Sequence, residues 1–189
     1  MTSLSDRAVR YLERCERFPA VPTVRVEQAL RDGGWPCPPQ WLEFHDRYAG
    51  YVERIHRDVA VWGLAHEESF WFGPGRVSVD AEEDPVLIHC ADLHPSYEYQ
   101  LDAAGRFLGA GVEAESFGIH VERLALWREF VDAGPVDRVR PEPQGLLDRV
   151  AAGRIPEASD RYYGWHVTNR YLVVVDLADQ TVQTILQRA

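Results

Sequence analysis

An α+β fold, in which helices pack an antiparallel sheet, is what this sequence predicts, and three observations lead there. A short helix over residues 38–51 carries an aromatic face with the i, i+3, i+4, i+7 spacing of one helix side. The face consists of Trp41, Phe44, His45 and Tyr48. From Asp58 onward the hydrophobic period changes from helical to two, which indicates strands. The stretch 102–105 has the composition of a hairpin turn between two such strands.

The helix with the aromatic face has recognisable ends. Pro38 and Pro39 suit its first turn, where a missing amide proton costs little. Gly50 suits the left-handed residue that commonly follows a helix. Because so short a helix is unstable alone in water, its aromatic face must be covered. We expect the cover to be the sheet that begins at Asp58.

Two further helices precede it. Apolar residues repeat at helical spacing over 4–18, with Ser3 as the cap and arginines on the solvent side. A second helix is expected over 24–32, capped by Thr23 and closed by Gly33–Gly34.

The middle of the chain reads as short strands and a closing helix. The expected strands are 58–64, 69–72, 76–80, 85–90, 96–101 and 106–110. The first of these is apolar on both faces, which places it centrally in the sheet. A helix over 117–131 then closes this part of the chain. Its expected inward residues are Val121, Leu124, Trp127 and Val131.

The C-terminal part is predicted to be an extension. Residues 134–145 are rich in Pro, Gly and charge, which is typical of a linker. A short helix over 146–152 and strands over 165–176 and 181–187 follow. Because a helix and two strands bury too little to be stable alone, we expect them to add a hairpin to the same sheet. The predicted organisation is an α+β domain over 1–133 with an extension over 134–189.

Composition narrows the classes of partner. The chain has 189 residues and a net charge of −10, and all its basic residues are arginine. This balance argues against nucleic-acid binding, which needs a basic patch, and fits a protein partner with a basic surface. Solubility alone is the competing explanation of the charge.

The cysteines and the hydropathy of the sequence indicate in which cellular compartment the protein is expected. Cys15, Cys37 and Cys90 are odd in number and scattered, so we expect free thiols in a reducing environment. We see neither an apolar leader segment nor a stretch of membrane-spanning length. A cytoplasmic location, with no membrane partner, is therefore expected, and a monomer or weak dimer.

The order of the elements resembles the SUKH superfamily over residues 24–133. That family typically has a proline-led amphipathic helix that ends near a glycine, then an antiparallel meander with a glycine turn, here PPQWLEFHDRYAG and SYEYQLDAAGRFLG. The helix residues that carry the likeness are Pro39, Trp41, Leu42, Phe44, Tyr48 and Gly50. Where the family usually has Asn-Gly, this chain has Ala49-Gly50.

The resemblance implies a curved antiparallel sheet and a function in protein binding. Many bacterial members are immunity proteins that neutralise a cognate toxin, often a nuclease, and others are regulators, including regulators of cell-wall synthesis. The family pattern carries no catalytic residues, so we expect no enzyme activity and no cofactor. The leading hypothesis is an immunity or antitoxin-like protein, and the second is a regulatory scaffold of the same fold.

A metal-dependent hydrolase is the third hypothesis. Imidazole, thiolate and carboxylate are all zinc ligands, and His89, Cys90, Asp92 and His94 are close in sequence. Successive strand residues point to opposite faces, so His89 and Cys90 diverge. Only His89 with Asp92 or His94 can converge, and the simpler explanation is a buried Cys90 beside surface polar residues.

The stretch 109–114 matches the G-x-G-x-x-A pattern of dinucleotide sites. That fingerprint needs a parallel strand before it and a helix that opens within it. Here the preceding strand leaves a hairpin turn and is antiparallel. The glycines are better explained by a bulge or by a close approach to the helix.

Candidate partner-binding residues are acidic and aromatic side chains in or beside loops. They are Glu67, Glu68, Trp71, Phe72, Glu82, Glu83, Asp84, Glu113 and Glu115. The carboxylates would steer a basic partner, and the two aromatic residues would anchor it. The alternative is that loops are polar for solubility and that Trp71 faces the core.

Overall fold

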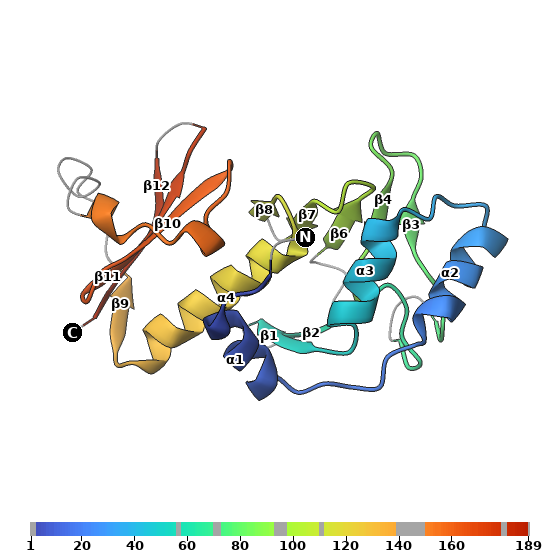
Figure 1. Ribbon diagram of the computed structural model, residues 1–189, viewed down its shortest axis with the longest axis horizontal. Coiled ribbons are helices and arrows are strands. Elements are labelled where there is room, and N and C mark those ends of the chain that lie inside the picture. The colour runs from blue at the N-terminus through green and yellow to red at the C-terminus, as the bar shows by residue number, and fades with distance from the viewer. Residues whose placement is uncertain are drawn as a thin grey trace. The chain divides into compact units, whose positions relative to one another are not determined.

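The computed structural model describes most of the chain. The described residues are 3–55, 58–69, 73–92, 98–109, 112–138, 150–178 and 181–188. They fold into two compact units (Figure 1), one of Met1–Glu13 with Ala114–Ala189 and the other of Arg14–Glu113. Each unit combines helices with antiparallel strands, which confirms the α+β class. This division differs from the predicted boundary at 133/134.

In the unit Arg14–Glu113, the helix with the aromatic face is α3 (Pro39–Tyr48), as predicted. Its four predicted face residues are all buried. Gly50 has φ +86°, and an added Cβ would lie 2.1 Å from the Phe18 carbonyl oxygen. The turn after α3 therefore requires glycine both for its backbone angle and for space. The preceding helix is α2 (Thr23–Asp32), in which Thr23 is the first residue and not the predicted cap.

The sheet that packs against α3 begins earlier in the sequence than predicted, because a strand β1 (Val52–Ile55) precedes β2 (Asp58–Trp62). Tyr48 meets the edge of Trp62 at 6.5 Å between ring centroids. The indole nitrogen of Trp41 donates to the carbonyl of Asp102, at 2.7 Å, in the strand β6 (Tyr99–Asp102). The helix therefore packs against two sheets.

Those two sheets are small and antiparallel. The first has the order β1-β2-β5 with β5 at Ala91–Asp92, so β2 is central as predicted. The second has the order β3-β4-β6-β7-β8. Its remaining strands are β3 (Val79–Asp80), β4 (Leu87–His89), β7 (Phe107–Gly109) and β8 (Val112–Ala114). The predicted hairpin turn joins β6 to β7, and Gly105 has φ +83° there.

The predicted strand 85–90 is wrong in its extent, because the chain changes sheet at Cys90. The Cys90 amide donates to the Tyr99 carbonyl in the second sheet, and its carbonyl accepts from Gly63 beside the first. The predicted strand 76–80 is likewise shorter, since only Val79–Asp80 pair. Most of the predicted strand 69–72 lies outside the described residues.

In the other unit, α1 (Asp6–Arg14) is shorter than the predicted 4–18. Its cap is Ser5, whose hydroxyl accepts from the Ala8 amide at 3.2 Å, and not the predicted Ser3. Beyond the helix the chain is extended, and Phe18 is exposed.

The closing helix α4 (Phe117–Asp132) begins at the cap Ser116 and agrees with the prediction in its bounds. Its predicted inward face is confirmed at Val121, which is buried, but not at Trp127, which is 37% exposed, and the buried residues also include Glu122 and Arg123. Charged side chains face inward here because distant segments supply their partners, as described below.

The predicted extension forms a sheet of its own with the order β10-β11-β12-β9. Its strands are β9 (Val136–Arg138), β10 (Tyr163–Val167), β11 (Tyr171–Asp176) and β12 (Val182–Arg188). In the described part of the chain none of these strands pairs with a strand of the earlier sheets, so the expectation of a hairpin added to the earlier sheet is wrong. The predicted strand 165–176 is two strands, and β9 lies inside the predicted linker.

Helix α4 explains how so small a sheet is stable. Leu126 and Phe130 of α4 pack with a buried cluster on the sheet. The cluster includes Ala158, Trp165, Leu172, Val174 and Leu186. The segment before β10 has two short 3-10 helices, η1 (Ala151–Gly153) and η2 (Pro156–Ala158). Most of the helix predicted over 146–152 lies outside the described residues. None of the described helices combines the length and hydrophobicity needed to cross a bilayer.

Candidate functional site

The predicted partner-binding carboxylates are exposed, but they are distributed over both units. Glu67 and Glu68 lie in the loop after β2. Glu82, Glu83 and Asp84 form the turn between β3 and β4, and Glu113 lies in β8. Glu115, just before α4, belongs to the other unit. Trp71 and Phe72 lie outside the described residues.

Some of these carboxylates are engaged within the chain. Glu67 pairs with Arg25 at 2.7 Å, and Glu115 pairs with Arg161 at 3.3 Å. Within the described ranges, no ion-pair partner approaches the three acidic side chains of the β3–β4 turn. This segment, Glu82–Asp84, is called the acidic turn below.

The base of the acidic turn is held by side chains. His89 in β4 lies 3.1 Å from the Asp80 carboxylate in β3, and Gln100 of β6 also donates to Asp80. These bonds join three neighbouring strands of the sheet. The acidic turn is therefore presented at the end of a braced hairpin.

The negative charge is concentrated in one unit. Residues 14–113 contain 17 Asp and Glu against 9 Arg, a formal net charge of −8. The remaining residues contain 13 acidic and 11 basic side chains, a net charge of −2. If charge served solubility alone, we would expect it to be spread more evenly over the two units.

The residues of the predicted zinc cluster are separated among sheets. His89 lies in β4, and Asp92 lies in β5 of the other sheet, where it accepts from Ser69 at 3.3 Å. Burial raises the pKa of the Cys90 thiol well above its usual value, which disfavours the thiolate that binds zinc. His94 lies outside the described residues. Among those that are described, no three His, Cys, Asp or Glu gather as metal ligands.

The described residues of the G-x-G-x-x-A stretch lie in strands. Gly109 ends β7, and Val112–Ala114 forms β8 beside it. None of the described residues of the motif is helical, whereas a dinucleotide site requires a helix that opens within it. A Cβ on Gly109 would lie 2.6 Å from the Tyr99 ring, so this glycine permits a close approach to the neighbouring strand β6, and not to the helix as predicted.

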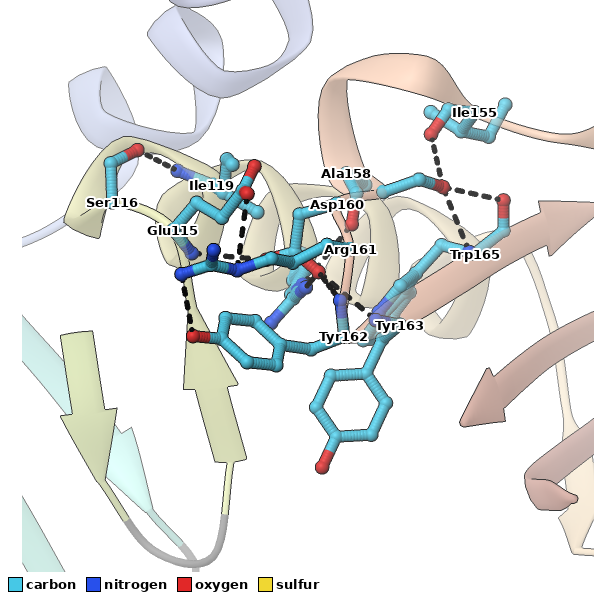
Figure 2. Close-up of polar contacts among 12 residues, drawn as sticks. Glu115, Ser116, Ile119, Ile155, Ala158, Asp160, Arg161, Tyr162, Tyr163 and Trp165 are labelled. Atoms are coloured by element: carbon cyan, nitrogen blue, oxygen red, sulfur yellow. Dashed lines mark hydrogen bonds and ion pairs between the residues drawn. The ribbon is translucent and has the colours of Figure 1, made fainter. Parts of the chain in front are cut away.

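The main polar constellation that sequence reasoning missed is centred on Asp160 (Figure 2). One carboxylate oxygen accepts from the amides of Tyr162 and Tyr163 at 2.9 and 3.0 Å. The other accepts from the Glu115 amide at 3.0 Å. The guanidinium of Arg123 lies 2.8 Å from Asp160, and both side chains are buried.

Arg123 joins this constellation to α4. Its Nε donates to the Ala158 carbonyl at 3.1 Å, and its guanidinium lies over the Tyr163 ring at 5.3 Å. Burial lowers the pKa of Arg123, and the adjacent Asp160 opposes that shift. The pair therefore fastens the segment before β10 to the first half of α4. Both carboxylate oxygens of Asp160 take part, one through the tyrosine amides and the other through the Glu115 amide.

Two other buried carboxylates have similar structural roles. Glu53 of β1 accepts from the indole of Trp62 at 3.1 Å and from the Tyr99 hydroxyl at 3.2 Å. Glu122 of α4 accepts from both the amide and the hydroxyl of Ser5 at 2.6 Å. No local pattern marks either glutamate as buried, so the sequence contained no signal for them.

Comparison with known proteins adds no relative: no family model, no curated protein and no solved structure matches this chain. The likeness to the SUKH superfamily therefore stays a prediction.

Proposed function

We propose that this chain is an acidic protein-binding module of the immunity type, which neutralises a toxin with a basic surface, such as a nuclease. The observation that carries the proposal is the acidic turn Glu82–Asp84, exposed at the end of a braced hairpin in the unit with net charge −8. The SUKH resemblance supports the same function, since many members of that family act in this way.

The physical role of the turn is steering. Charges beyond about 8 Å are largely screened at physiological salt, so a concentrated cluster attracts a partner better than scattered charges do. Complementary charge raises association rates by one to three orders of magnitude at low ionic strength. The hairpin holds three carboxylates in adjacent positions, so they add to one local field.

The test uses the product of the neighbouring gene, co-expressed and purified with this chain. The variant E82Q/E83Q/D84N removes three charges from the turn. The matched control E129Q/D132N/E157Q removes three exposed charges from the other unit. Association rates are measured by stopped-flow at several salt concentrations.

We expect the turn variant to associate about tenfold more slowly at low salt, with a weaker salt dependence, and the control to stay within about twofold. Equal rates for the two variants would reject the acidic turn as the steering surface. A neighbouring toxin-like product that forms no complex with the chain would contradict the immunity proposal.

A further inference from the structure

His45 has a place in the core that only one form of its imidazole can fill. The side chain is 1% exposed on the inner face of α3. Its Nδ1 accepts from the Leu64 amide at 3.0 Å, and its Nε2 lies 2.7 Å from the Val21 carbonyl oxygen. An amide can only donate and a carbonyl can only accept. These two partners therefore assign the neutral tautomer with its proton on Nε2.

The two bonds connect three separate segments of the unit. Val21 belongs to the connection before α2, His45 to α3, and Leu64 to the loop that follows β2. Val21 and Leu64 are themselves buried. Water therefore cannot readily replace the imidazole as their partner, and an unsatisfied buried backbone group is costly.

Protonation is incompatible with this arrangement. An imidazolium carries a proton on Nδ1, which would face the Leu64 N–H and put two donors against each other. The ionisable groups around His45 are Asp46 on α3 and His66 in the loop after β2. The connection 18–22 has no ionisable side chain. Burial lowers the pKa of His45, and the Val21 carbonyl and Asp46 oppose this shift only in part.

We propose that His45 is an acid-sensitive latch, which when neutral holds the connection before α2 and the loop after β2 on α3, and which releases both when it is protonated. Proton linkage gives the direction in which pH changes the stability of the closed latch. In the open state the imidazole titrates near its ordinary pKa of about 6.5, and in the closed state it titrates lower. The latch is therefore fully closed above pH 6.5, and its opening becomes more favourable as the pH falls below that value.

The experiment follows the latch at single-residue resolution in the full chain. NMR spectra that correlate ring nitrogens with ring protons report the tautomer of His45 and its titration. Hydrogen-exchange protection of the Leu64 amide, corrected for the intrinsic effect of pH, reports opening. The variant H45Q retains a donor and an acceptor but does not titrate. The control H166Q removes a histidine from the other unit, where the His166 ring bonds the Val150 carbonyl.

We expect the Nε2-protonated tautomer at neutral pH, and a loss of Leu64 protection as the pH falls below 6.5, of at most about tenfold per pH unit, in the native protein and in H166Q. His66 is present in all three proteins, so the difference between the native protein and H45Q isolates His45. A His45 ring that titrates near 6.5 while Leu64 stays protected would overturn the proposal. If H45Q does not fold, the titration of the His45 ring and the protection of the Leu64 amide in the native protein decide whether the proposal holds.

Discussion

Replacing Asp160 by asparagine should strongly destabilise the unit that contains α4 and the C-terminal sheet. The carboxylate neutralises Arg123 at 2.8 Å, and the side chains of both residues are almost fully buried, at 0% and 3% exposure. Asparagine has nearly the same shape but no charge, so it leaves Arg123 as an uncompensated buried cation. Removal of one partner of such a pair typically costs about 3–5 kcal/mol.

Hydrogen bonding adds to this loss. One oxygen of Asp160 accepts from two tyrosine amides and the other from the Glu115 amide. An asparagine oxygen placed against the tyrosine amides turns its NH₂ group toward Glu115 N–H, where no bond can form. An unsatisfied buried donor costs about 1–3 kcal/mol, which overlaps in part with the charge term. We therefore expect D160N to lower the free energy of unfolding by at least about 3 kcal/mol.

Urea denaturation of the full chain measures this change, followed by the NMR amide signals of β10, which lies in the same unit. The matched control is Glu115→Gln, which breaks the neighbouring pair with Arg161. That pair is exposed, at 44% and 56%, so solvent screening limits its contribution to about 0–1 kcal/mol. A loss below about 1 kcal/mol for D160N, or equal losses for both variants, would refute the reasoning from burial.

Other substitutions test the remaining contacts. Gly50→Ala should lower the free energy of unfolding by more than about 2 kcal/mol, since the added Cβ meets the Phe18 carbonyl at 2.1 Å. Gly34→Ala is also at positive φ but in open space, and should lower it by only about 1 kcal/mol. Thermal unfolding compares the two variants, and equal losses of stability would contradict the steric argument. Glu122→Gln should loosen α1 by about 1–3 kcal/mol, because the carboxylate holds both polar groups of Ser5 at 2.6 Å. Hydrogen exchange over residues 6–14 should rise in that variant, and unchanged protection would show that other contacts hold α1.

The elements that were predicted correctly depend on neighbours in the sequence. The aromatic stripe of α3 and the hairpin between β6 and β7 are both set by patterns within about a dozen residues. Helix α4 has a local cap, and its bounds also agreed. The exposure of the acidic turn belongs to this class, since consecutive carboxylates in a turn remain in water.

The burial of charged side chains was not predicted from the sequence, and the reason is physical. A charged side chain enters the core only when a partner meets it, and these partners are remote in sequence. Ser5 and Glu122 are 117 residues apart, and Tyr99 and Glu53 are 46 apart. Without knowledge of the partner, each glutamate reads as a surface residue.

Hydrophobic periodicity was therefore enough to indicate which residues form helices, which form strands, and that the two kinds pack together. Sheet membership, the division into two units and the burial of Asp160 with Arg123 depend on contacts between distant segments. Those contacts form only when the folded chain removes both partners from water together, because the desolvation of either charge alone is too costly.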